Sequence, residues 1–283
     1  MDDTKFLITG ANGQLGTALQ AKYPNARATD SDDLDITDRQ SLASFDWGNV
    51  TTILNAAAYT NVDGAETPEG RIAAWRVNAQ AAANLATIAL EKKLLLVHIS
   101  TDYVFDGAKN PHTEDEALSP LSVYGASKAA GDIAVSMTRK HYLLRTSWVI
   151  GDGKNFVRTM LELGGKGVNP SVVADQIGRP TFTAELVKTI DHLLNNQLDF
   201  GTYNISNAGE PVSWAGLTRA VFAEAGLPNT VTDTTTADYY EDKPQAAQRP
   251  LNSLYDLSKI QATDFEPTDW RVDLKEYLKK EMS

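Results

Sequence analysis

The first half of the chain alternates short apolar runs with longer amphipathic stretches. The apolar runs predict buried strands, and the stretches between them, with apolar residues three or four positions apart, predict helices. The predicted strands are residues 5–9, 26–30, 51–55, 94–100 and 141–145, and the predicted helices are residues 14–22, 38–45, 70–92 and 123–139. This order is typical of strand–helix units that pack helices on both faces of a parallel sheet.

The pattern changes beyond Gly151, where glycine and proline become more frequent and the periodic runs shorten. The clearest elements there are predicted helices at 184–194 and 214–225 and a predicted strand at 201–205. We therefore expect an α/β fold with a doubly wound parallel sheet and a smaller, partly interleaved α/β domain. The first domain would comprise residues 1–150, joined by returning segments around 183–206, and the second mainly residues 151–283.

The chain is acidic and has no cysteine. Its 26 Lys and Arg residues oppose 37 Asp and Glu residues, a formal net charge of −11 that makes nucleic acid an unexpected partner. The lack of cysteine removes disulfides and Cys-based zinc sites, and it fits a reducing compartment. No apolar stretch approaches the ~20 residues of a membrane span, and no signal segment opens the chain, so we expect a cytoplasmic protein without membrane association.

A glycine-rich turn lies between the first predicted strand and the first predicted helix, with its glycines spaced G-x-x-G-x-x-G. Residues without Cβ let the backbone approach a pyrophosphate, whose charge then rests on the N–H groups at the positive end of the helix. On the glycines alone, a plain strand–helix turn is the alternative. The turn therefore indicates a dinucleotide-binding site and a Rossmann-type sheet. The residues of the turn that would bind the dinucleotide are Gly10, Asn12, Gly13, Gln14, Leu15 and Gly16.

Residues at the next two strand ends extend this interpretation. Asp30 ends the second predicted strand, where a carboxylate can accept hydrogen bonds from the adenosine ribose. An acid there favours NADH over NADPH, because a 2′-phosphate would lie against it and no arginine follows within the next few residues. Asp35 and Ile36 could bracket the adenine. The alanines that end the third strand could let a cofactor pass, although they could equally be helix-packing residues.

Tyr124 and Lys128 are four residues apart in a predicted helix, hence about one turn apart on one face. A nearby ammonium favours the phenolate and lowers a phenol's pKa, so this tyrosine could exchange a proton with a substrate oxygen. The same spacing recurs at residues 239–243 and 255–259, but both pairs lie far downstream of the predicted sheet.

A hydroxyl-rich turn, Ser100-Thr101-Asp102-Tyr103, ends the fourth predicted strand. Thr101 could supply a second hydrogen bond to a polarised carbonyl, with Ser100 as the second choice. The alternative is an ordinary strand-end cap.

The order of these motifs resembles the extended short-chain dehydrogenase/reductase family. Four further runs resemble its dTDP-4-dehydrorhamnose reductase branch, and the resemblance spans nearly the whole chain. These runs are STDYVFDG at residues 100–107, RTSWVIG at 145–151, D-Q-x-G-R-P-T at 175–181 and R-P-x-x-S at 249–253.

The resemblance implies that NADH or NADPH reduces the C4 keto group of dTDP-4-dehydro-L-rhamnose to give dTDP-L-rhamnose. Tyr124 would donate a proton to O4, Lys128 would tune this phenol and hold the nicotinamide ribose, and Thr101 would hydrogen-bond the carbonyl oxygen. Residues 1–150 would then be the dinucleotide-binding domain and residues 151–283 mainly the substrate-binding domain.

The resemblance also assigns binding residues. Cofactor contacts fall on Gly13, Gln14, Leu15, Asp30, Asp35, Ile36, Ala57, Ala58 and Tyr59, and substrate contacts on Thr101, Asp102, Trp148 and, at the diphosphate, Arg179. Otherwise Trp148 would be a core aromatic and Arg179 would form a surface salt bridge.

No metal site is expected. Some members of this branch are thought to pair through a metal held partly by an acid in the helix after the glycine turn, but residues 17–20 read Thr-Ala-Leu-Gln. The four histidines lack ligand spacing, and the acidic run at 114–116 is expected to be a solvated loop. We therefore expect a monomer or a weak dimer.

Two other function classes stay open. A reductase-like regulatory or binding subunit could keep the cofactor pocket without catalysis, although Thr101, Tyr124 and Lys128 are all present. An NAD-retaining sugar-nucleotide epimerase or dehydratase is the other alternative, but dehydratases typically carry an acid where this chain has Tyr103. The substrate could carry UDP in place of dTDP. The chain could also work beside, or joined to, a dTDP-sugar epimerase.

Overall fold

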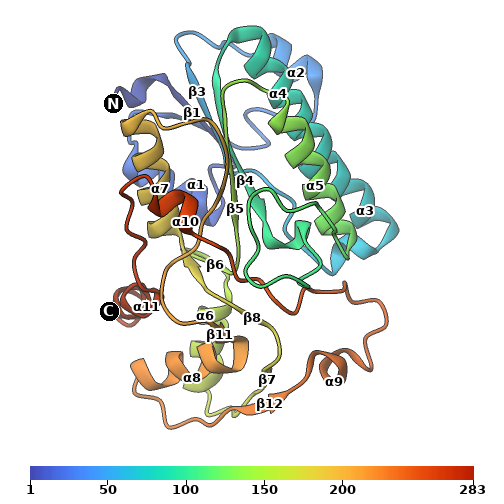
Figure 1. Ribbon diagram of the computed structural model, residues 1–283, viewed down its shortest axis with the longest axis vertical. Helices are drawn as coiled ribbons and strands as arrows, with labels where there is room; N and C mark the ends of the chain where they lie inside the picture. The colour runs from blue at the N-terminus through green and yellow to red at the C-terminus, as the bar shows by residue number, and fades with distance from the viewer.

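The computed structural model describes residues 1–283 and is centred on a six-stranded sheet (Figure 1). The strands are β1 (Phe6–Thr9), β2 (Arg27–Thr29), β3 (Thr52–Asn55), β4 (Leu95–Thr101), β5 (His141–Thr146) and β10 (Gly201–Asn204). They are all parallel, in the order β10-β5-β4-β3-β1-β2. The chain changes winding direction between β1 and β3, and open sheets of this kind bind ligands beyond the strand carboxyl ends at that point.

Helices cover both faces of this sheet, which makes the fold an α/β, Rossmann-like one, as predicted (Figure 1). One face packs on α1 (Gln14–Lys22) and α7 (Thr183–Asn196), and the other on α2 (Arg39–Ser44), α4 (Ala81–Lys92) and α5 (Val123–Ser136). Side chains alternate along β1: Phe6 and Ile8 face the first layer and Leu7 the second. Both faces are therefore buried, which explains why these strands read as continuous apolar runs.

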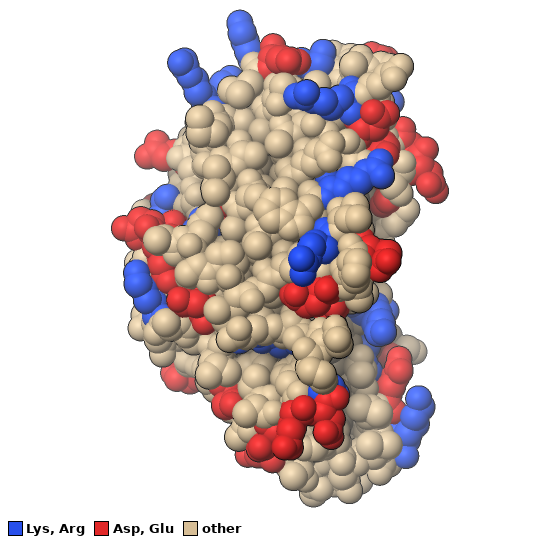
Figure 2. All heavy atoms as spheres, turned by 90° about the vertical axis from the view of Figure 1, so that its right-hand side faces the viewer, with Lys and Arg blue, Asp and Glu red and all other residues tan.

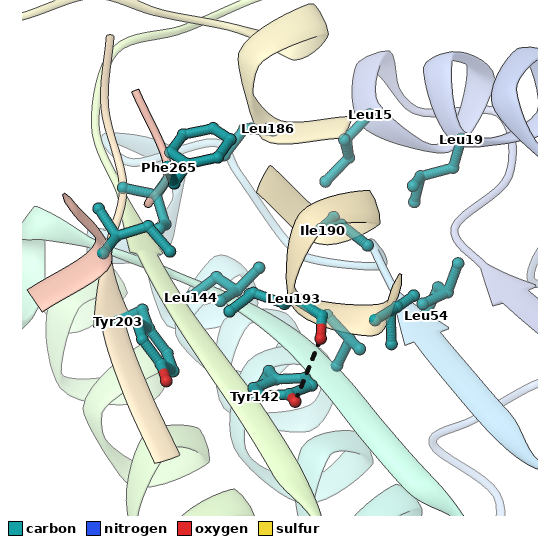
Figure 3. Packing of buried hydrophobic residues seen from close by; sticks show 14 of the residues in the cluster. Leu15, Leu19, Leu54, Tyr142, Leu144, Leu186, Ile190, Leu193, Tyr203 and Phe265 are labelled. Carbon is teal, nitrogen blue, oxygen red and sulfur yellow. Dashed lines mark hydrogen bonds between the residues drawn. The ribbon is translucent and has the colours of Figure 1, made fainter. Parts of the chain in front are cut away.

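The core on the α1 and α7 side closes against the strands (Figure 3). Leu15 and Leu19 of α1 meet Leu186, Ile190 and Leu193 of α7 above the sheet. The buried Tyr142 hydroxyl donates to the Leu193 carbonyl at 3.4 Å and to the Leu198 carbonyl at 2.5 Å, so this ring keeps its hydrogen bonds inside the core. The glycine-turn helix is thereby anchored to the sheet through a segment far away in sequence.

The long helix predicted over residues 70–92 is interrupted. It comprises α3 (Pro68–Ala74), a π-helical turn η3 (Trp75–Gln80) and α4. Hydrophobic spacing does not distinguish a π-turn from an α-turn of similar composition, which is why the prediction missed it. Short 3-10 segments complete the first half: η1 (Asp3–Lys5), η2 (Gly64–Glu66) and η4 (Asp102–Val104).

The second half builds a separate apolar cluster below the sheet around Phe222 and Trp270, but it also returns to the sheet through α7 and β10. Its strands pair in twos: β6 (Val149–Ile150) with β9 (Thr181–Phe182), β7 (Ser171–Val173) with β12 (Thr232–Thr234), and β8 (Ile177–Gly178) with β11 (Val212–Ser213). Its other helices are α6 (Phe156–Gly165), α8 (Trp214–Glu224), α9 (Thr236–Tyr240), α10 (Ser258–Gln261) and α11 (Trp270–Glu281).

The face that carries α3, η3 and α5 has few charged side chains at its centre (Figure 2). Four large apolar residues are exposed in these helices or directly after α5: Ile72, Trp75, Ile133 and Met137. In this view, charged side chains lie just right of the tan central area and around the outline of the molecule. None of the helices combines the length and apolar character needed to cross a lipid bilayer.

Candidate active site

The glycine turn connects β1 to α1 at the point where the winding direction changes. Gly10 has φ +70°, and a Cβ there would lie 2.5 Å from the Ala57 backbone. A Cβ on Gly16 would lie 2.1 Å from the Gly10 carbonyl oxygen. Gly13 is the N-cap of α1 and supplies no capping side chain, so the N–H groups of the first helical turn face outward without a side-chain partner. This is the geometry that receives an anion.

A cavity of about 550 Å³ opens beside this turn and extends to α5. It unites most of the predicted cofactor, catalytic and sugar residues, which come from five separate segments: Asn12, Gly13, Gln14, Leu15, Ala57, Ala58, Thr101, Asp102, Tyr124, Lys128 and Trp148. A smaller cavity of about 80 Å³ is lined by Gly10 of the glycine turn and by the predicted adenosine contacts Asp30, Asp35 and Ile36. Gly16, Tyr59 and Arg179 line neither cavity.

Tyr124 and Lys128 lie in α5 behind a Ser122 N-cap, and both are almost fully buried. Burial raises the pKa of the Tyr124 phenol above its usual value, and the Thr101 hydroxyl only partly opposes this. The expected lowering by Lys128 is therefore wrong. The Lys128 ammonium donates to the Ile99 carbonyl at 2.6 Å, and burial lowers the pKa of Lys128 to about 8. Desolvation is the largest cause of both shifts, and the effects that oppose it come from Thr101 on Tyr124 and from Asp132 on Lys128.

Thr101 ends β4 and has two hydrogen bonds. Its hydroxyl donates to Asp102 Oδ1 at 3.0 Å and accepts the Tyr103 N–H at 3.3 Å, so it also caps η4, as the alternative interpretation predicted. The Ser253 hydroxyl donates to Asp102 Oδ2. Burial raises the pKa of Asp102 to about 6, against the opposing effect of these two donors.

Asp30 is tied to the glycine turn. Its carboxylate accepts the Asn12 N–H at 2.9 Å and the Ser31 N–H at 2.8 Å. Asp35 accepts the Thr37 hydroxyl at 2.6 Å, and this bond is the main cause that holds its pKa below the usual value. Both carboxylates thus lie at the small cavity, held by bonds to neighbouring backbone and side-chain groups.

Trp148 and Arg179 lie next to each other in the second half. Trp148 has φ +49° and stacks on Trp214 with ring centroids 3.7 Å apart, while its edge lines the large cavity. The Arg179 guanidinium donates to the carbonyls of Gly209 at 2.8 Å and Tyr255 at 3.3 Å. Arg179 therefore holds backbone segments together, and it forms no surface salt bridge.

Sequence reasoning missed two residues that support the site. Ser253 was noted only as part of a resembling run, and Asn78 was not considered. The buried Asn78 side chain accepts the Tyr59 N–H at 2.9 Å and donates to the Tyr59 carbonyl at 3.1 Å and the Ser127 hydroxyl at 3.0 Å. No local pattern could have revealed either contact, because each joins distant segments.

The acidic run at residues 114–116 is not the solvated loop that was expected. Glu116 is buried and pairs with His112 at 2.9 Å, and Glu114 accepts the backbone N–H of Asn204 at 3.0 Å. The Glu114 bond attaches the loop to β10 and the Glu116 pair closes the loop on itself, whereas Asp115 between them is exposed. No group of three or more His, Cys, Asp or Glu side chains is arranged to hold a metal ion.

Comparison with known proteins agrees with this geometry. The model of one family, described as RmlD substrate binding domain, matches residues 4–283. A dTDP-4-dehydrorhamnose reductase of Aggregatibacter actinomycetemcomitans is 39% identical, with 96% of this chain and 97% of the relative covered. The spore coat polysaccharide biosynthesis protein SpsK of Bacillus subtilis is 36% identical, with 99% of each chain covered.

Solved structures give the same result. A dTDP-4-dehydrorhamnose reductase of Bacillus anthracis in complex with NADP has a TM-score of 0.89 and 35% identity, covering 97% of this chain and 98% of that one. Another, from Clostridium acetobutylicum, has a TM-score of 0.89 and 37% identity, with 98% and 99% covered. Since the family model and these relatives each cover nearly the whole chain, the chain belongs to the RmlD substrate-binding-domain family.

Proposed function

We propose that this protein reduces the C4 keto group of dTDP-4-dehydro-L-rhamnose to give dTDP-L-rhamnose, with NADH or NADPH as the reductant. The observation that carries the proposal is the large cavity, which is lined by the glycine turn, Thr101, Tyr124 and Lys128 together. The family membership and the reductases among the relatives support the reaction class.

Tyr124 is the proposed proton donor. Because burial raises its pKa, the phenol is protonated at neutral pH, which is the form needed to give a proton to the oxygen that becomes O4. Lys128 holds α5 against β4 through the Ile99 carbonyl and is proposed to reach the nicotinamide ribose. Thr101 supplies a second hydrogen bond to the same oxygen, where negative charge develops as hydride arrives at C4.

The cofactor site is proposed on the glycine turn, which fits a dinucleotide because Gly10 and Gly16 leave no room for Cβ atoms. When bound, the nicotinamide supplies the hydride. Asn12, Gly13, Gln14 and Leu15 are proposed to hold the pyrophosphate side. Ala57, Ala58, Tyr59, Asp35 and Ile36 are proposed to hold the remainder.

NADH is the proposed preference. Asp30 already accepts two backbone N–H groups, and a 2′-phosphate would meet this carboxylate and that of Asp33, whose Oδ2 accepts the Asp30 N–H at 3.3 Å. Two anions beside a phosphate disfavour NADPH.

The substrate side is proposed to face the second half of the chain. Thr101 and Trp148 would contact the sugar, and Asp102 lines the same cavity while accepting the Thr101 hydroxyl. We leave Arg179 out of the contact set, because its guanidinium is already bound to two carbonyls. In this arrangement residues 1–150, with the segment around 183–206, form the dinucleotide-binding domain and residues 151–283 mainly the substrate-binding domain. The chain is proposed to act as a monomer or weak dimer.

The proposal is tested by following the absorbance of the reduced nicotinamide while an upstream dehydratase and epimerase generate the substrate in place. The wild-type protein should oxidise the cofactor, and Tyr124→Phe should lower kcat by about 10²- to 10⁴-fold, the usual contribution of a general acid. Comparing NADH with NADPH tests the argument from Asp30.

Cofactor binding, measured by fluorescence, provides the control for Tyr124→Phe and should be retained, because the lost hydroxyl is on the substrate side. A folded wild-type protein that binds cofactor but turns over no substrate would contradict the proposal and favour the regulatory-subunit alternative.

A further inference from the structure

Asp102 is a buried carboxyl group whose two oxygens are both occupied. Only 2% of the residue is exposed. Oδ1 accepts the Thr101 hydroxyl at 3.0 Å and Oδ2 accepts the Ser253 hydroxyl. No lysine or arginine forms an ion pair with it, unlike the buried Asp132, which pairs with Arg145 at 3.0 Å. Two neutral donors stabilise a buried anion less than a cation would.

The groups around Asp102 do not compensate its charge. Three phenols face it: Tyr103 of η4, Tyr124 of α5 and Tyr255 of the carboxyl-terminal segment. His112 is the titratable group that favours the anion, and its ring nitrogens bond to two acceptors, Glu116 and the Asn252 carbonyl, but its effect on Asp102 is smaller than that of burial. The carboxyl therefore takes up a proton more readily than an exposed aspartate, with a pKa raised to about 6.

The protonation state of Asp102 decides which group the Thr101 hydroxyl can donate its hydrogen bond to. A threonine hydroxyl has a single hydrogen, and in this structure it points to Asp102 Oδ1. An ionised carboxylate is only an acceptor and keeps this hydrogen. A protonated carboxyl can instead donate to the Thr101 oxygen, which leaves the Thr101 hydrogen free to turn toward the cavity.

We propose that Asp102, seated by Ser253, is a positioning residue that aims the Thr101 hydroxyl at the substrate carbonyl oxygen only while Asp102 is protonated. The inference rests on the proposed function, because it assigns a consequence to the bond between Thr101 and O4. No proton leaves the carboxyl in this role. The proton that reaches O4 still comes from Tyr124, and Thr101 stabilises the developing oxyanion.

Bound ligands should add to the effect of burial on the Asp102 carboxyl. The diphosphates of a nucleotide sugar and of a dinucleotide would add negative charge to the cavity that Asp102 lines. Like charges disfavour the carboxylate, so the protonated form should be more populated in the working complex than in the free protein.

The test is the pH profile of kcat/KM for the wild-type protein, Asp102→Asn and Ser253→Ala. The wild type should lose activity as pH rises through the pKa of Asp102, by roughly tenfold per pH unit once the carboxyl is ionised. An asparagine amide does not titrate, so in Asp102→Asn this fall should vanish, leaving only the decline near pH 8 expected from Lys128. At pH 5, where the wild-type carboxyl is protonated, the activity of Asp102→Asn should be less than tenfold below that of the wild type.

Ser253→Ala provides the second variant. Loss of its hydroxyl removes a donor that stabilises the carboxylate, so the fall in activity should move to higher pH. Ser206→Ala is the matched control, since Ser206 is equally buried but bonds to the Asn207 carbonyl, and its profile should match the wild type.

Denaturant unfolding at pH 5 and pH 8 measures the same titration without turnover. Because the pKa of Asp102 is higher in the folded than in the unfolded chain, the wild type should lose stability relative to Asp102→Asn between these pH values. An activity fall that survives in Asp102→Asn, or an equal stability difference at both pH values, overturns the inference alone. A wild type without turnover at any pH overturns the proposed function, and this inference with it.

Discussion

At the scale of single residues, desolvation sets the properties of the ionisable groups in the cavity. Tyr124, Lys128 and Asp102 all lie in surroundings that disfavour their charged forms. Neutral forms of the phenol and of the carboxyl are the ones that can donate hydrogen bonds. The site is thereby equipped to meet a substrate oxygen that gains negative charge, which is what a ketone reduction requires.

The glycine turn allows a direct test by substitution. In Gly16→Ala, the new Cβ would lie 2.1 Å from the Gly10 carbonyl oxygen and 2.8 Å from the Ala11 backbone, so the turn must shift. We expect a loss of about 1–3 kcal/mol in the free energy of unfolding and weaker NADH binding, measured by denaturant unfolding and fluorescence titration.

The control for this change is Gly165→Ala, because no atom lies within 4 Å of the added Cβ and the residue ends α6. It should stabilise the protein by about 0.4–1 kcal/mol through the unfolded chain. Equal losses in both variants would show that the close approach at Gly16 is unimportant.

At the scale of elements, the π-helical turn η3 places the Asn78 side chain between the segment that follows β3 and helix α5. Asn78 binds both backbone groups of Tyr59 and the Ser127 hydroxyl, one residue before Lys128. It joins the strand end that carries the cofactor alanines to the helix that carries the proton donor. Single π-turns of this kind often occur at functional sites.

Removing this side chain should loosen both segments. We expect Asn78→Ala to lower the free energy of unfolding by about 1–3 kcal/mol, because the Tyr59 backbone groups lose their partner, and to raise KM for the cofactor. Gln80→Ala, an exposed residue of the same turn, should change neither quantity. If Asn78→Ala behaved like Gln80→Ala, the bridge would not support the site.

Most elements could be predicted from the sequence because their signals are local. The strand and helix positions follow from apolar periodicity, and the glycine turn and the Tyr124–Lys128 pair follow from spacing. The sequence could not show that burial raises the Tyr124 pKa, since desolvation depends on the packing of distant segments. The same reason hid the contact between Asp102 and Ser253, which are 151 positions apart, and the bond from the Asn204 backbone N–H to Glu114.

At the scale of the whole molecule, polar bonds attach the carboxyl-terminal segment both to the first half and to strand β10 of the shared sheet. Arg249 pairs with Asp63 at 2.8 Å, and Lys259 donates to the Thr202 carbonyl at 2.7 Å. The segment between Arg249 and Lys259 places the Ser253 hydroxyl against the Asp102 carboxyl. The helix after the glycine turn offers Thr17, Ala18, Leu19 and Gln20 on its first turns, and none of these side chains is a carboxylate.

Metal removal should therefore leave the assembly unchanged. We expect sedimentation at micromolar concentration to give the mass of one chain, 30.8 kDa, or a weak dimer whose population does not depend on EDTA or added Mg²⁺. Turnover should be equally insensitive. A dimer that forms only with Mg²⁺ would contradict this and require carboxylates outside that helix.

The late position of β10 in the chain affects folding during synthesis. Its neighbour β5 ends at Thr146, but β10 begins only at Gly201, so one edge of the parallel sheet has no strand partner while the intervening residues are made. An open edge can pair with other chains. A ribosome-bound chain therefore exposes this edge until β10 emerges, and it lacks the Ser253 contact until still later. During synthesis, a protein of this fold would form its parallel sheet first and complete the polar contacts beside its active-site cavity last.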